Sequence, residues 1–201
     1  MMNDQLIVFA RYPERGKVKT RLAAELGADE ALAVYRQLLA HTERVTAPLA
    51  AARVLWLAEA PPPGAPPLWP DGPQRVQPAG ADLGQRMRHA FGEAFARGAQ
   101  RAVVIGTDCP GLSTAHLRQA YERLLTHDVV LGPATDGGYY LLGLRAPQPA
   151  LFAGISWSTA TVLADTRAAA QRQQLRVALL PELSDVDTAA DLAVWRGAAR
   201  G

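Results

Sequence analysis

The run Leu6-Ile7-Val8-Phe9-Ala10 is the clearest structural signal in the chain, since it is apolar at every position. A strand that is covered by helices on both faces is expected to read this way, whereas a strand with one face in water alternates apolar and polar residues. Pro13 and Gly16 follow, and they indicate a loop. This stretch therefore predicts a central strand whose carboxyl end leads into a loop.

Similar apolar runs alternate along the chain with segments whose apolar residues recur at helical spacing. The expected strands are 54–58, 102–106, 129–131, 139–144 and 175–180, and the expected helices begin at Asp29, Asp82, Ser113, Thr159 and Thr188. This alternation is typical of βαβ units and predicts an α/β fold with a mostly parallel sheet. The stretch 60–73 is dense in proline and glycine, but too few residues precede it to form a domain. We therefore expect a surface loop within one domain spanning 1–201.

Composition and charge exclude several classes of protein. The 201 residues carry 21 Lys and Arg against 19 Asp and Glu, a net charge of +2, which does not suggest a nucleic-acid-binding protein. No apolar stretch approaches the roughly 18 residues of a membrane span, and Met1 to Ala10 lacks the cationic flank of an export signal. Cys109 is the single cysteine, which excludes an internal disulfide. We expect a cytoplasmic protein without membrane or nucleic-acid partners.

A basic segment, Arg11 to Arg21, follows the first expected strand. It holds five basic residues and one acid, a local charge of +4 in a chain whose total is +2. Ligands of open α/β sheets bind at the carboxyl ends of the strands, and Gly16 would let the backbone approach a phosphate there. The Gly-Lys-Ser/Thr ending of a P-loop is absent. The segment is interpreted as a phosphate-binding loop, with a solvated basic loop as the alternative.

Acidic residues follow two other expected strands. Asp108 stands directly after 102–106, where a carboxylate can bind a divalent cation that bridges phosphates. Asp185 and Asp187 alternate, so in an extended segment they share one face, and either could join Asp108 around a metal ion. The alternative is that these carboxylates cap helices or turns. Cys109 is expected to pack rather than to act as a nucleophile.

Two further segments combine ligand-contacting and turn-forming residues. Asp136-Gly137-Gly138-Tyr139 lies between two expected strands, where its glycines suit either close backbone approach to a ligand or a hairpin turn. Trp157-Ser158-Thr159 could contact an acceptor or cap the helix that follows. The four histidines show no metal-ligand spacing and are interpreted as ordinary core or surface residues.

Taken together, these motifs resemble one group of GT-A-like transferases. The motifs are 9–13, 16–22, 106–110, 132–140, 157–159 and 185–188. The group is related to 2-phospholactate and molybdenum-cofactor guanylyltransferases, and its members are often labelled glycosyltransferases associated with radical-SAM, selenodomain or arsenosugar genes. The resemblance implies a three-layer α/β/α nucleotide-diphospho-sugar transferase fold.

The resemblance also implies a role for each matching residue. Nucleotide binding would fall to Arg11, Gly16, Lys17, Lys19, Arg21, Gln85 and Arg86, with Gly84 beside the last two. Mg²⁺ or Mn²⁺ would be held by Asp108 and Asp187, and Asp108, Asp136 and Lys19 would act in catalysis. The substrate would contact Gly137, Gly138, Tyr139, Trp157, Ser158 and Thr159. The partners would be a nucleotide sugar or nucleoside triphosphate and a small-molecule acceptor, and a homodimer is possible.

Three functions are compatible with these residues. A glycosyltransferase would release a nucleoside diphosphate, with Asp136 positioning the sugar or activating the acceptor. A nucleotidyltransferase would release pyrophosphate. A non-catalytic nucleotide-binding module would not need separated acids such as Asp108 and Asp187. Glycosyl transfer is favoured because the Leu-x-x-Gly-x-Gly-x-Arg loop of sugar nucleotidyltransferases is missing, although Thr107-Asp108-Cys109 replaces the Asp-x-Asp of many glycosyltransferases.

Overall fold

A seven-stranded sheet forms the centre of the protein, for which the computed structural model describes residues 3–198. Its strands are β1 (Asp4–Ala10), β2 (Ala52–Leu57), β3 (Gln74–Val76), β4 (Arg101–Ile105), β5 (Val129–Pro133), β6 (Tyr139–Leu144) and β7 (Val177–Leu179). They lie in the order β3-β2-β1-β4-β6-β5-β7, and β6 alone of these strands runs antiparallel to its neighbours. The predicted mostly parallel sheet is confirmed. The domain expected over 1–201 extends at both ends beyond the described residues.

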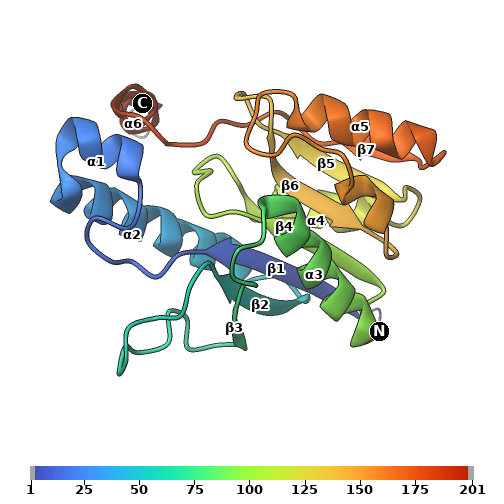
Figure 1. Cartoon of the computed structure of the whole chain (residues 1–201), viewed down its shortest axis with the longest axis horizontal. Helices are drawn as coiled ribbons and strands as arrows, with labels where there is room; N and C mark the ends of the chain where they lie inside the picture. The colour runs from blue at the N-terminus through green and yellow to red at the C-terminus, as the bar shows by residue number, and fades with distance from the viewer. Residues whose placement is uncertain (1–2, 199–201) are drawn as a thin grey trace.

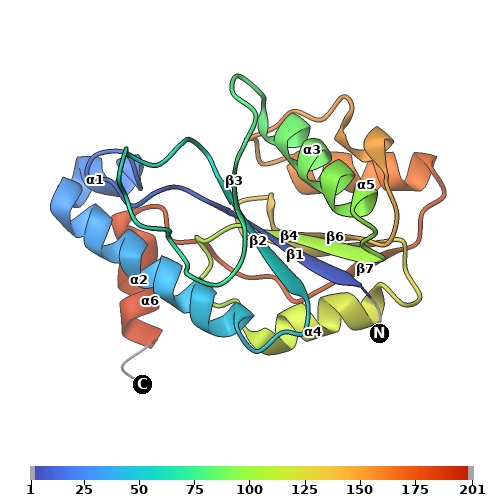
Figure 2. The same ribbon diagram turned by 90° about the horizontal axis from the view of Figure 1, so that it is seen from below.

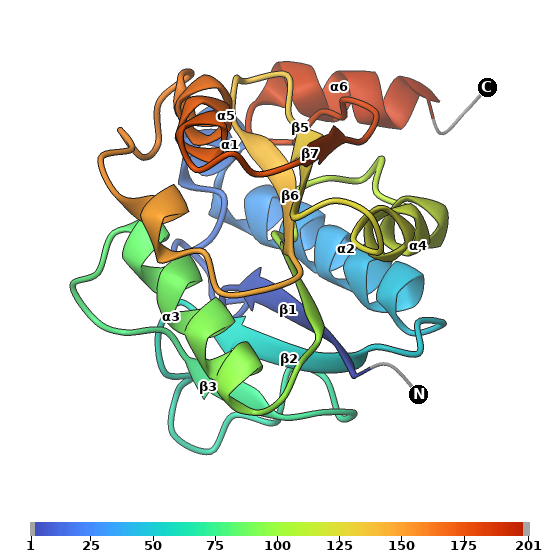
Figure 3. The same ribbon diagram turned by 90° about the vertical axis from the view of Figure 1, so that its right-hand side faces the viewer.

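Helices cover both faces of the sheet, as Figures 1, 2 and 3 show. They are α1 (Thr20–Leu26), α2 (Ala28–Thr46), α3 (Leu83–Ala96), α4 (Thr114–Arg123), α5 (Val162–Arg172), α6 (Ala189–Ala198) and a short 3-10 helix, η1 (Pro149–Phe152). In Figure 3, α3 and α5 lie on one side of the sheet, and α2 and α4 lie on the other. The fold is therefore the expected three-layer α/β/α arrangement. Within residues 3–198, none of the helices has both the length and the apolar character that crossing a membrane requires.

The apolar run in β1 is buried because the strand lies inside the sheet, between β2 and β4. Leu6 and Val8 belong to the core beneath α2 and α4, whereas Ile7 belongs to the core beneath α3 and α5. All three side chains are fully buried. Burying each contributes about 1.5–3 kcal/mol to the free energy of folding. The predicted central strand is confirmed together with its physical cause.

Helix α1 begins at Thr20, at the end of the basic segment, and has one fully buried side chain, Leu22. Strand β3 was not expected from the sequence. It follows the proline-rich loop and pairs through three residues with β2, which is too short a stretch to show a hydrophobic period. The strand expected over 175–180 is shorter in the structure, where β7 spans Val177–Leu179. The helix expected from Thr159 begins at Val162, after a turn at Thr159.

The strand order places the carboxyl ends of β1 and β4 side by side near the middle of the sheet. The chain crosses from β1 to β2 through α2 on one face, and from β3 to β4 through α3 on the other face. Ligands of open α/β sheets bind outside the carboxyl ends of the strands. The carboxyl ends of β1 and β4 meet there, since Val8 pairs with Ile105.

Candidate functional site

A cavity of about 490 Å³ opens at the carboxyl ends of β1 and β4. Its volume lies within the usual range for pockets that bind small molecules and cofactors. The residues singled out from the sequence that line it are Arg11, Lys19, Arg21, Arg86, Asp108, Tyr139, Asp185 and Asp187. They come from five separate segments of the chain, so the fold brings together side chains that are far apart in the sequence.

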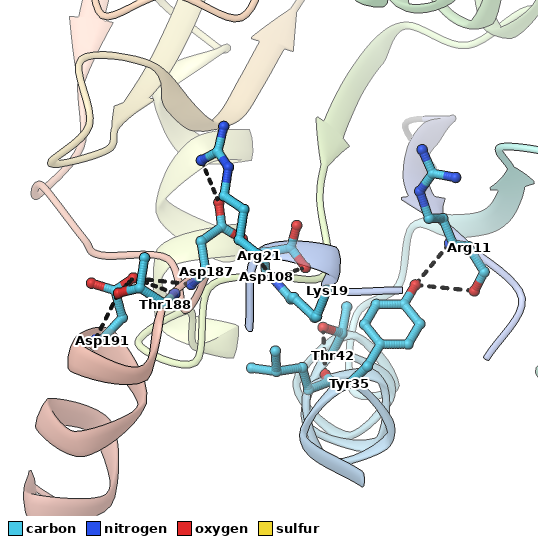
Figure 4. Close-up of polar contacts among 10 residues, drawn as sticks. Arg11, Lys19, Arg21, Tyr35, Thr42, Asp108, Asp187, Thr188 and Asp191 are labelled. Carbon is cyan, nitrogen blue, oxygen red and sulfur yellow. Dashed lines mark hydrogen bonds and ion pairs between the residues drawn. The ribbon is translucent and has the colours of Figure 1, made fainter. Parts of the chain in front are cut away.

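The centre of this site is an ion-paired group of Lys19, Asp108 and Asp187 (Figure 4). The Lys19 Nζ lies 2.7 Å from Asp108 Oδ1 and 2.9 Å from Asp187 Oδ1. Its side chain is 4% exposed, whereas those of the two aspartates are 44% and 45% exposed. Burial alone would lower the pKa of Lys19, but the two carboxylates raise it above its ordinary value. The amine therefore stays charged beneath two carboxylates that reach the cavity.

The backbone holds Lys19 in this position at a conformational cost. Its φ of 47° lies in the left-handed region, which residues other than glycine rarely adopt. It occupies the position before the first turn of α1. Such a conformation persists only where the surrounding contacts impose it, and these cases cluster at functional sites. Here the contacts are the two carboxylates.

The two aspartates are positioned by backbone contacts at their own segments. Asp108 follows β4, and its carbonyl accepts a hydrogen bond of 2.9 Å from the Val186 N–H, which ties the segment carrying Asp187 to the end of β4. Asp191 Oδ2 accepts hydrogen bonds from the backbone N–H groups of Asp187 and Thr188 at the start of α6. Thr188 caps α6 through its Oγ1, which accepts from the Asp191 N–H, and Asp191 completes this reciprocal cap. The Asp187 carboxylate is not used for capping and faces Lys19 and Arg21.

Tyr35 on α2 anchors the start of the basic segment, a role that no motif in the sequence indicates. Its hydroxyl accepts a hydrogen bond of 2.7 Å from the Arg11 N–H and donates one of 3.0 Å to the Arg11 carbonyl (Figure 4). Burial raises the pKa of Tyr35 to about 12, so the hydroxyl keeps its proton at neutral pH.

Gln77 and Arg86 form a second polar pair in the wall of the cavity. Arg86 Nη1 donates to Gln77 Oε1 at 3.2 Å, and Arg86 Nε donates to the Ala81 carbonyl at 2.8 Å. Gln77 Nε2 donates to the Trp56 carbonyl. The guanidinium of Arg86 is thus held at the wall of the cavity by two neutral acceptors. Gln77 is buried and follows β3, a strand that the sequence pattern did not predict.

Several residues expected at the site do not line this cavity. They are Gly16, Lys17, Gln85, Asp136, Gly137, Gly138, Trp157, Ser158 and Thr159. Lys17 pairs with Glu14, and Gln85 completes a capping box with Asp82 at the start of α3. Asp136 Oδ1 accepts a hydrogen bond from the Gly138 N–H, as expected of a turn. Lys17, Gln85 and Asp136 therefore make local structural contacts, in a loop, a helix cap and a turn.

Trp157 packs against the first turn of α3 instead of lining the cavity. A Cβ on Gly84 would overlap the Trp157 ring, so this glycine is required for the close approach. The ring also stacks with Phe152, with 6.4 Å between centroids. Ser158, the next residue, has a φ of 64°. Trp157 thus fixes the end of α3 that carries Arg86, two residues beyond Gly84.

Comparison with known proteins places this architecture in a family. Residues 38–159, more than half of the chain, match the family described as "uncharacterized protein conserved in bacteria" (DUF2064). The chain belongs to this DUF2064 family. A comparison with curated proteins finds no match.

Solved structures share the fold of this DUF2064 protein. A crystal structure described as a candidate nucleotide-diphospho-sugar transferase from Desulfovibrio desulfuricans G20 is 36% identical, with a TM-score of 0.90, and the match covers 97% of this chain and 87% of that one. CMP:2-keto-3-deoxy-manno-octonic acid synthetase complexed with CTP has a TM-score of 0.61 at 11% identity, over 98% of both chains. Rv0371c of Mycobacterium tuberculosis H37Rv, complexed with manganese, has a TM-score of 0.59 at 17% identity, over 96% and 97%. The last two show the fold alone.

The donor set of the DUF2064 protein suits a hard divalent cation. Asp108 and Asp187 contact the same Lys19 amine, so their carboxylates converge on one point of the cavity wall. Mg²⁺ and Mn²⁺ prefer such oxygen donors, and Mg²⁺ commonly takes one or two carboxylates with the remaining positions filled by water and substrate phosphates. Within residues 3–198 there is no group of three or more His, Cys, Asp or Glu side chains placed to hold a metal ion.

The thiol of Cys109 is expected to be unreactive in the folded protein. The residue is 6% exposed, and burial raises its pKa to about 12, with a further contribution from the charge of Asp185. Because the thiolate is the reactive form, iodoacetamide at pH 8 should leave the native protein unlabelled over an hour and label it fully in denaturant. Mass spectrometry measures both. Rapid labelling of the native protein would contradict the packing role assigned to Cys109.

Proposed function

We propose that this DUF2064 protein is a metal-dependent transferase that uses a nucleotide-activated donor, and that it transfers a glycosyl group from a nucleotide sugar to a small acceptor. The observation that carries the proposal is that Lys19, Asp108 and Asp187 meet at the wall of a cavity that arginine side chains also line. A site that combines two carboxylates with separate basic groups matches a diphosphate and its divalent ion. The 36% identity to a candidate nucleotide-diphospho-sugar transferase supports the same assignment.

Each charged group has a distinct part in this proposal. Arg11 and Arg21 are 53% and 79% exposed, and they pair with Glu59 at 3.6 Å and with Asp187 at 3.8 Å. Such long, exposed ion pairs contribute little, so both guanidinium groups can exchange them for phosphate oxygens. Arg86 supplies a fixed cation on the α3 side. A divalent ion held by Asp108 and Asp187 would neutralise the negative charge that develops on a leaving diphosphate. The chain's own contribution is to orient the donor and keep these charges in place before the reaction starts.

The reaction proposed is attack of an acceptor hydroxyl on the anomeric carbon of the sugar. The bond from that carbon to the diphosphate oxygen breaks, the electron pair leaves with the nucleoside diphosphate, and the acceptor's hydroxyl proton passes to a carboxylate of the cavity wall or to solvent. Asp136 was the residue expected to activate the hydroxyl, but its carboxylate accepts from the Gly138 N–H outside the cavity lining. Asp185 is the further carboxylate that lines the cavity, and we assign acceptor binding to this part of the wall.

Nucleotidyl transfer is the second candidate, and donor binding separates it from glycosyl transfer. Thermal unfolding with Mn²⁺ is measured against a panel of nucleotide sugars and nucleoside triphosphates. A ligand present at about a hundred times its dissociation constant adds about 2.7 kcal/mol, which raises the midpoint by several degrees in a protein of this size. We expect one nucleotide sugar to do so. Stabilisation by a triphosphate alone would indicate nucleotidyl transfer, and no response to either class would leave a non-catalytic role.

A further inference from the structure

Lys19 contacts the same two carboxylates that the proposed metal ion requires. Its Nζ bonds one oxygen of Asp108 and one of Asp187, at 2.7 and 2.9 Å. The lysine is buried below them, and the carboxylates are nearly half exposed on the cavity side. Each carboxylate therefore has an amine on the protein side and open space on the ligand side. A cation that binds from the cavity meets an ammonium group already in place.

The charges make this contact unfavourable for a metal ion that arrives alone. Two carboxylates without Lys19 would present two negative charges to the cavity, whereas the ammonium reduces their sum to a single negative charge. It also repels a second cation held on the same oxygens, and repulsion between charges a few ångströms apart is strong in a partly buried site. The affinity for a free divalent ion should therefore be low.

A donor diphosphate changes that balance. Lys19 lines the same cavity as Arg11 and Arg21, so an anion bound by these arginines brings negative charge to the cavity that the ammonium borders. Phosphate oxygens would offset the charge of the ammonium and would supply further ligands to the metal ion. On the basis of the proposed function, we infer that Lys19 makes metal binding depend on donor binding: its charge opposes a metal ion at Asp108 and Asp187 until donor phosphates offset that charge. Coupling of this kind is reciprocal, so the ion strengthens donor binding equally.

The test measures Mn²⁺ binding, by the electron paramagnetic resonance signal of free Mn²⁺, in the absence of any nucleotide. Lys19→Met and Lys19→Gln remove the charge, and both should bind Mn²⁺ at least about tenfold more tightly than the wild type. Lys19→Arg keeps the charge and should bind it as weakly as the wild type. A merely structural role would lower Mn²⁺ affinity in Lys19→Met and Lys19→Gln, and equal or weaker binding by both would overturn the inference.

Two further measurements place the effect. In the double variant Lys19→Met with Asp108→Asn, the gained Mn²⁺ affinity should disappear. Its persistence would show that the ion binds elsewhere and would refute the inference.

The second measurement adds inorganic pyrophosphate and follows the Mn²⁺ that the protein retains on ultrafiltration. Pyrophosphate should increase the retained Mn²⁺ more for the wild type than for Lys19→Met. Equal increases would refute coupling through Lys19. These Mn²⁺ measurements use no sugar donor, so they test the inference separately from the proposed function. Tighter Mn²⁺ binding by the uncharged Lys19 variants, with no turnover by the wild type, would count against the proposed function alone. Mn²⁺-dependent turnover by the wild type, with unchanged Mn²⁺ binding in those variants, would count against this inference alone.

Discussion

Replacing Asp108 with Asn is expected to lower turnover by at least about 10²–10³-fold, the loss typical of removing one preorganised electrostatic contact from a reacting site. The substitution keeps the shape of the side chain and removes the charge that Lys19 contacts at 2.7 Å. It also removes one of the two carboxylates proposed to hold the metal ion. Turnover is followed with the donor identified by thermal unfolding, at saturating Mn²⁺.

Asp128→Asn is the matched control for this prediction. Asp128 also pairs with basic side chains, Arg145 and Arg176, but it does not line the cavity. Its replacement should leave turnover within about twofold of the wild type, because surface charge changes away from a site have small effects. If Asp108→Asn retained activity comparable to that of Asp128→Asn, the assignment of the Lys19, Asp108 and Asp187 group would be wrong.

Gly137→Ala is expected to lower the free energy of unfolding by about 3 kcal/mol or more. Two costs combine, since a left-handed backbone costs a side chain about 1–2 kcal/mol and a forced overlap costs about 1–3 kcal/mol. Gly137 has a φ of 87°, and a Cβ there would overlap the backbone oxygen of Ala160. The Gly137 carbonyl also accepts a hydrogen bond from the Leu163 N–H at the start of α5. Chemical denaturation measures the loss.

Gly154→Ala separates the two costs. Gly154 has a φ of 70°, but a Cβ there would meet nothing within 4 Å. Its replacement should therefore cost only the backbone term, about 1–2 kcal/mol. Equal losses of unfolding free energy in Gly137→Ala and Gly154→Ala would show that the loop around Ala160 moves to accommodate the methyl group. Steric overlap would then not explain why position 137 is a glycine.

The sheet could be predicted from the sequence because its strands carry long apolar runs. β1 and β4 were located correctly, and Asp108 and the basic segment were assigned to the carboxyl ends where the structure has them. Strand β3 was missed because three residues do not establish a period. Its absence from the prediction also concealed Gln77, which reaches the cavity because β3 ends beside it.

The arrangement of side chains within the site was less predictable than the identity of the residues. Lys19 was expected to contact phosphates, which stays a prediction, and its ion pair with Asp187, 168 positions away in the sequence, was not foreseen. Trp157 was expected at the substrate and packs on Gly84. In both cases the partner is set by long-range packing, which local spacing does not encode. The Asp-Gly-Gly sequence was compatible with a turn and a ligand contact, and its hydrogen bonds are those of the turn.

We propose that this DUF2064 protein cleaves a nucleotide-activated donor in the cavity at the carboxyl ends of β1 and β4. The most direct measurement is phosphorus NMR of the stabilising donor, incubated with the protein, Mg²⁺ and a bacterial small-molecule extract as the source of acceptor. Asp108→Asn serves as the blank. We predict that nucleotide sugar is consumed and the terminal phosphate signal of a nucleoside diphosphate appears, in the wild type only. An unchanged donor spectrum with the wild-type protein, or equal consumption by both proteins, would contradict the claim.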